Sequence, residues 1–172
     1  MNTLRQQALQ VVLKPDPDRK SAEARLLDEY GCIGAEADLQ EPAGVPGRPA
    51  RPELVAHTAV KPRSMSTVEG RAALTHALAH IELNAIDLAL DICWRFAGMP
   101  HDFYRKWLVV AKKEALQFEL LRDHMHALGH AYGDFPAHRV LWEMAERTKH
   151  DPLTSRRRAG LVRNRQGARI VG

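Results

Sequence analysis

Two acidic residues, Glu114 and Glu82, fall on predicted helices at positions that face apolar neighbours. In the stretch KKEALQFELL, residues 112–121, helical spacing places Glu114 at the centre of an apolar face. A carboxylate in a dry interface is costly unless a partner, a shifted pKa or a metal ion offsets its charge. Glu82 lies on the flank of the apolar face of the preceding helix. Two acids facing a shared core are typical of carboxylate metal sites in helical bundles.

Other polar residues offer alternatives to this interpretation. Glu114 could be a structural acid, paired with an arginine or a buried hydroxyl, although a second inward acid on the neighbouring helix favours the metal. His76 and His80 are four residues apart, a spacing that can chelate a metal. Helical spacing nevertheless turns both, together with Asp87, away from the apolar side. Solvated or capping roles are expected for four further histidines: His124, His126, His130 and His138.

The elements that position these acids are predicted to be helices throughout. Apolar residues recur at helical spacing, and no segment alternates like a strand. We predict helices over residues 3–13, 21–30, 67–97, 101–132 and 137–150. The two long helices are joined by a short turn, which predicts an antiparallel αα-hairpin, the unit of a helical bundle. Residues 31–61 are rich in glycine and proline and predict an extended wrapping segment without a core.

Length and composition indicate how these elements are organised into domains. A chain of 172 residues with 45% hydrophobic residues suits one domain with a core. We divide it into an N-terminal part (1–62), a helical bundle (63–151) and a tail (152–172). The polar N-terminus contains no unbroken apolar run, so neither a signal peptide nor a membrane span is predicted, and the expected location is the cytoplasm.

The net charge of +4 comes from the tail. Residues 152–172 hold six arginines and no acidic residue, which leaves 19 basic and 21 acidic residues in the rest of the chain. A terminal arginine cluster can bind phosphates, but no sequence-reading module accompanies it. We therefore expect a disordered tail and no nucleic-acid partner.

Several stretches together resemble a bacterial family of ferritin-like proteins catalogued as domain of unknown function 455. They are GRPARPELV, EGRAALTHALAHIELNAIDLALD, KKEALQFELL, YGDFPAH and LWEMAERTKHD. The resemblance covers roughly residues 1 to 151 and implies an all-α, ferritin-like four-helix bundle with a di-metal carboxylate centre that holds iron or manganese and no organic cofactor. In such bundles, two helices each supply one Glu, and the other two each supply a Glu-x-x-His pair.

The resemblance implies roles for three residues of this chain. Glu82 is similar to the single Glu of the first core helix, and Glu114 to the Glu of a Glu-x-x-His pair. The position of the paired histidine is occupied by Gln117. An amide is a poorer metal ligand than an imidazole, so Gln117 is expected to bind only weakly.

The resemblance is lost after about residue 151, where family members continue into more of the third helix and a fourth core helix. This indicates an incomplete bundle, from a truncated or frame-shifted gene product, that lacks half of the ligand set. Glu143 and Glu146 turn away from the apolar face of the third helix and do not replace it. Two hypotheses follow: a di-metal protein for redox chemistry or metal binding, or a non-catalytic helical protein that self-associates as a homo-oligomer through an exposed apolar groove.

Overall fold

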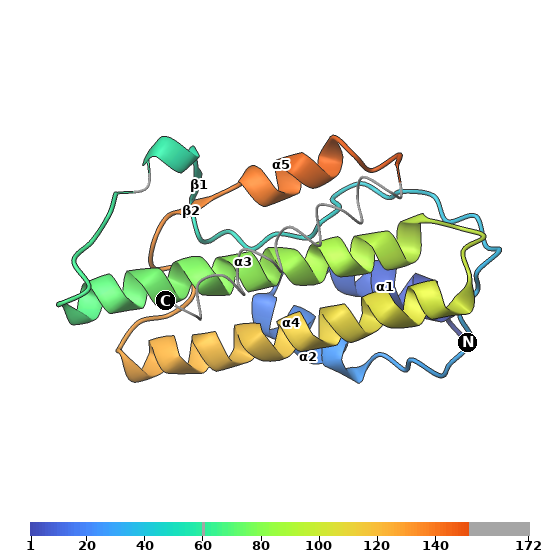
Figure 1. The fold of residues 1–172 in the computed structure, drawn as a ribbon, viewed down its shortest axis with the longest axis horizontal. Helices are drawn as coiled ribbons and strands as arrows, with labels where there is room; N and C mark the ends of the chain where they lie inside the picture. The colour runs from blue at the N-terminus through green and yellow to red at the C-terminus, as the bar shows by residue number, and fades with distance from the viewer. Residues whose placement is uncertain (60, 152–172) are drawn as a thin grey trace.

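Two long helices, α3 and α4, run antiparallel and side by side along the molecule (Figure 1). In the computed structural model, which describes residues 1–59 and 61–151, α3 spans Val68–Arg95 and α4 spans His101–Ala127. Thr67 begins α3 as its N-cap, because its side chain accepts a hydrogen bond from the backbone amide of Gly70. Gly98, with a φ of 69°, turns the chain between the two helices. The predicted αα-hairpin is confirmed.

Two shorter helices, α1 (Leu4–Val12) and α2 (Pro17–Leu26), pack against this hairpin. Thr3 caps α1 in a reciprocal arrangement with Gln6. Asp16 caps α2, and a proline occupies the first helical position, where its missing N–H costs nothing. These signals start α2 before the predicted residue 21, and the helix ends at Leu26.

The segment that follows α2 contributes to the core, so the prediction that it would not was wrong. Ile33 and Ala35 are buried and belong to the same apolar cluster as α1, α3 and α4. The reason is Arg5, whose fully buried guanidinium donates hydrogen bonds to the carbonyl oxygens of Gly34, Ala35 and Ala37. These bonds satisfy backbone groups that would otherwise be buried without partners.

A pair of two-residue strands joins distant parts of the chain. β1 (Leu54–Val55) pairs in parallel with β2 (Ala137–His138), next to a short 3₁₀ helix at His57–Ala59. The last described helix, α5 (Val140–Glu146), is shorter than the predicted 137–150, because the strand pair takes its first residues. The strand pair is a small exception to the predicted all-α fold, which is otherwise mostly helical.

The helix α4 ends five residues before the predicted residue 132. Gly129 adopts a φ of 79° just beyond its last turn, a conformation that stops helices. Tyr132 therefore lies on a loop, and Phe118 packs edge-on against its ring at 5.5 Å between centroids.

The core lies where α1 and α2 cover the hairpin. Its most buried members include Leu4, Ala8, Val12, Ile86, Leu90, Leu108 and Phe118. Trp142 on α5 is also buried. Within the described residues, no helix combines the length and apolar character needed to cross a membrane. The Arg-rich tail lies outside the described residues.

Candidate functional site

Glu82 and Glu114 meet between the two long helices. Each lies near the middle of its helix, and their exposed fractions are only 5% and 3%. The side chain of Gln117, one turn along α4 from Glu114, bridges them. Its amide nitrogen donates to Oε2 of Glu82 at 3.2 Å and to Oε2 of Glu114 at 2.9 Å. The three predicted site residues are thus brought together.

Hydrogen bonding fixes the orientation of the bridging amide. The opposite orientation would place the amide oxygen of Gln117 against two carboxylate oxygens, which only accept hydrogen bonds when ionised. Gln117 therefore acts as a neutral donor shared by two buried acids. Removing a carboxylate from water is costly, and a hydrogen-bond donor or a cation beside it offsets that cost.

The donor set fits part of a metal site. Two carboxylates from neighbouring antiparallel helices are suitable ligands for iron or manganese, and Gln117 could add its amide oxygen after a rotation. Across residues 1–59 and 61–151, however, no group of three or more His, Cys, Asp or Glu side chains could hold a metal ion. The described residues supply two of the four carboxylates, and neither of the two imidazoles, that the resemblance implies.

The apolar residues beside Glu82 are less buried than predicted. Leu74 is 42% exposed, and Leu78, Ile81 and Leu88 are half-buried. All four lie on one face of α3, the face expected to form the core. The core uses mainly a face turned roughly a third of the way around the helix, since α4 and α1 cover that side, although Ile92 on the first face also belongs to it. Glu82 stands at the boundary between the two faces.

The side of α3 predicted to be solvated is buried. His76, His80 and Asp87 are 1%, 4% and 5% exposed, which corrects the expectation that they face solvent. The N-terminal segment and the loop at Tyr132 cover them. A hydrogen bond of 3.0 Å runs from the backbone amide of Gly133 to Nε2 of His76, so this nitrogen accepts and carries no proton.

His80 makes two hydrogen bonds, one as a donor and one as an acceptor. Its Nε2 lies 2.8 Å from the carbonyl oxygen of His138, which can only accept, so Nε2 carries the proton. Nδ1 then accepts from the hydroxyl of Tyr132, also at 2.8 Å. Burial lowers the pKa of His80 to about 4 and that of His76 to about 4, and it raises the pKa of Tyr132. All three are therefore neutral near pH 7.

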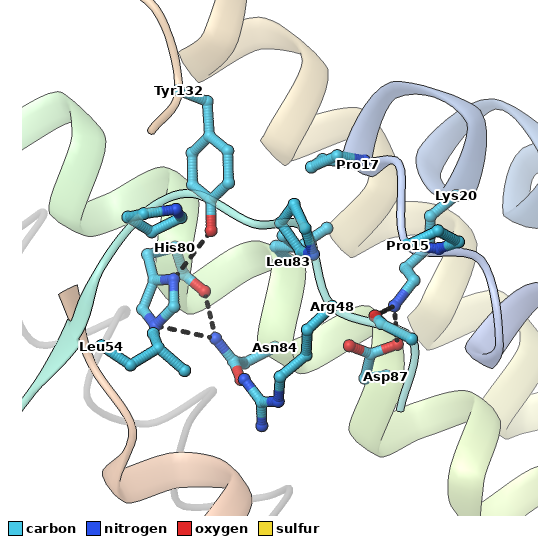
Figure 2. Close-up of a pocket in the computed structure, with 13 residues that line it drawn as sticks. Pro15, Pro17, Lys20, Arg48, Leu54, His80, Leu83, Asn84, Asp87 and Tyr132 are labelled. Atoms are coloured by element: carbon cyan, nitrogen blue, oxygen red, sulfur yellow. Dashed lines mark hydrogen bonds and ion pairs between the residues drawn. The ribbon is translucent and has the colours of Figure 1, made fainter. Parts of the chain in front are cut away.

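Asp87 forms a buried ion pair with a residue from α2. Nζ of Lys20 lies 2.6 Å from Oδ1 of Asp87 and also donates to the carbonyl oxygen of Gly47 at 2.9 Å. Burial raises the pKa of Asp87 to about 6, although Lys20 opposes the rise. The contact ties α2 and the segment at Gly47 to the middle of α3 (Figure 2).

Of the remaining histidines, His124 and His126 are exposed on α4, as predicted. His130 is half-buried and lies 3.7 Å from the Asp134 carboxylate. His138 is half-buried in β2, and its Nδ1 has no hydrogen-bond partner among the described residues. Glu143 is exposed, in agreement with its predicted outward direction.

Sequence reasoning missed the buried polar group on α3. The residues His76, His80, Asn84 and Asp87 recur at helical spacing and form one stripe. The sequence placed three of them, His76, His80 and Asp87, away from the apolar side of the helix. Lys20 gave no signal either, because it lies in a polar segment and no sequence pattern links residue 20 to residue 87.

Comparison with known proteins places the chain in a family. A family model described as "Protein of unknown function (DUF455)" matches residues 13–165. The chain is similar to an uncharacterized protein of Haemophilus influenzae, with 48% identity over 110 residues that cover 60% of this chain and 38% of that relative. No solved structure matches the chain. The family match extends past residue 151, so the truncation inferred there stays a prediction.

Proposed function

We propose that this chain, which belongs to the DUF455 family, binds a divalent iron or manganese ion between Glu82 and Glu114 in a ferritin-like arrangement of α3 and α4. The observation that carries the proposal is the shared hydrogen bonding of two buried acids. Both carboxylates, from separate helices, lie within reach of the single amide nitrogen of Gln117. A cation between them would offset two buried negative charges with the oxygen ligands that these metals accept.

The proposal is for binding of moderate strength. Gln117 replaces an imidazole, and the described residues supply two carboxylates where the ferritin-like pattern uses four with two histidines. Redox chemistry would require further ligands around the metal, and a second chain could supply them, because residues 152–172 contain no Asp, Glu, His or Cys. The family relative is more than twice as long as the aligned part, which leaves room for such ligands in related proteins.

Metal binding can be tested directly on the purified chain. Ferrous iron is added without air, and bound metal per chain is measured for the wild type, Glu114→Gln and a control, Glu119→Gln. Glu119 is on the same helix but pairs with Arg25 at 2.5 Å. The proposal expects binding by the wild type and the control and loss in Glu114→Gln. Equal binding by all three proteins would place any metal elsewhere, and no binding by the wild type would refute the proposal.

A variant that should bind the metal more tightly extends the same test. Gln117→His restores the imidazole that the Glu-x-x-His pattern expects, so it should bind ferrous iron about tenfold or more tightly than the wild type. If the variant folds and binds no better, Gln117 does not face the metal.

The second candidate function is self-association without catalysis. The partly exposed face of α3 that contains Leu74, Leu78, Ile81 and Leu88 favours it, because apolar residues in contact with water gain free energy on burial. A dimer should appear in size-exclusion chromatography with light scattering and should weaken on Leu78→Lys. A chain that stays monomeric at all concentrations would exclude this function.

A further inference from the structure

A small hollow on the opposite side of α3 from Glu82 gathers hydrogen-bond donors that have unused protons (Figure 2). Asn84 follows Glu82 by two residues and therefore projects about 200° away around the helix. The hollow is lined by Asn84, His80 and Asp87 of α3, by Lys20 of α2, and by Arg48 of the extended segment. Its central volume is about 20 Å³, the space of roughly one water molecule, and it opens outward.

Asn84 has one amide proton without an acceptor. Its Nδ2 donates to the backbone carbonyl of His80 at 2.7 Å. The second proton lies toward Nε2 of His80, 3.2 Å away. That nitrogen already carries a proton for the carbonyl of His138, so it cannot accept another. Asn84 is only 4% exposed, and an unsatisfied donor at that depth is costly.

Two cations add further donors to the same hollow. The guanidinium of Arg48 stacks on Trp142, 5.8 Å from the ring centroid, and forms no hydrogen bond or ion pair with residues of the described ranges. Lys20 has three ammonium protons, of which Asp87 and the carbonyl of Gly47 take two. His80 is neutral, so Lys20, Arg48 and Asp87 together give the lining a formal charge of +1.

We infer that this hollow binds the carboxylate group of a small organic acid, held by Arg48, Asn84 and the third proton of Lys20. A ligand that fits should offer acceptors to these donors and carry a negative charge, which the lining charge of +1 attracts although the Asp87 carboxylate opposes it. The planar fork of a guanidinium matches the two oxygens of a carboxylate. The central space holds about one water molecule, so one carboxylate oxygen would occupy it, while the second oxygen and the rest of the acid would lie in the open mouth. This site is independent of the proposed metal site.

The test titrates the full chain with sodium acetate and, separately, with inorganic phosphate, at constant ionic strength maintained with sodium chloride. Binding is followed by amide and side-chain NMR shifts. We expect saturable shifts with acetate, concentrated at the side-chain amide of Asn84. Arg48→Gln should weaken acetate binding at least about tenfold, because a charge-assisted pair is lost. The matched control Arg51→Gln removes an exposed arginine three residues away and should leave binding unchanged.

Each alternative outcome overturns the inference in a defined way. Saturable binding of phosphate in place of acetate would exclude the carboxylate class. Shifts that do not saturate, or equal weakening by Arg48→Gln and Arg51→Gln, would show only general attraction of anions to a basic surface. Arg48→Lys keeps the positive charge but lacks the planar guanidinium, and it tests the same contact if Arg48→Gln fails to fold. Full affinity in this variant would exclude bidentate recognition.

Discussion

His80 links the stability of the fold to pH, and its replacement tests the burial of the polar side of α3. Its pKa falls from an ordinary 6.5 to about 4, because burial disfavours the charged ring. The folded state therefore binds fewer protons than the unfolded state between these two values. The stability that depends on neutral His80 is present above pH 6.5 and is lost as the pH falls toward 4.

The magnitude follows from the two pKa values. A tenfold change in proton affinity corresponds to about 1.4 kcal/mol, so full protonation of His80 lowers the free energy of unfolding by about 3 kcal/mol. His80→Gln should cost about 1–2 kcal/mol near neutral pH, because the Tyr132 hydroxyl loses its acceptor. Toward pH 4 the wild type loses more than the variant, so the difference between them should vanish or reverse.

Urea denaturation between neutral pH and about pH 4.5 measures this difference, since the linear extrapolation gives the free energy of unfolding at each pH. His76 titrates in both proteins and so largely cancels. His124→Gln, which changes an exposed ring on α4, is the control and should match the wild type throughout. A difference between His80→Gln and the wild type that stays constant over the whole range would refute the burial and neutral state of His80.

Three further substitutions test the packing around the hairpin. Lys20→Met leaves the Asp87 carboxylate buried without its cation and should lower the free energy of unfolding by about 3–5 kcal/mol in urea denaturation. The double variant Lys20→Met with Asp87→Leu should recover most of this loss. Equal losses in the single and the double variant would contradict the ion pair. Arg5→Met removes all hydrogen bonds from a fully buried guanidinium and should cost at least about 3 kcal/mol in the same assay; a loss below about 1 kcal/mol would contradict them. Gly47→Ala should lower Tm by several degrees more than Gly44→Ala, since the Cβ at 47 would clash with backbone atoms, whereas Gly44 has open space and alanine there is disfavoured only by the φ of 80°; the reverse order would contradict the close approach.

The sequence was informative about the hairpin and its acids because both depend on local pattern. Helical periodicity alone placed Glu114 inside the apolar face of its helix, and the structure buries it. Glu82 stood on the flank of its helix in the sequence, and it lies at the boundary of two faces in the structure. The family resemblance supplied Gln117 as the third member of the group.

The polar side of α3 could not be predicted in the same way, because its burial depends on distant segments. The stripe from His76 to Asp87 has the spacing of a solvated helical face. Its cover comes from residues far away on both sides in the sequence, held by bonds such as that of Lys20 to Gly47 and that of Tyr132 to His80. Periodicity within a helix shows which residues share a side, and it does not show what packs against that side.

The central claim, that Glu82 and Glu114 together bind a metal ion, is tested most directly by crystallography with manganese. Crystals grown with Mn²⁺ and measured near the manganese absorption edge locate the ion by its anomalous signal. Our account predicts one peak bonded to a carboxylate oxygen of each acid, with the Gln117 amide nitrogen turned away from both. A map without a peak there, in which Gln117 still donates to both carboxylates at full manganese concentration, would contradict the claim.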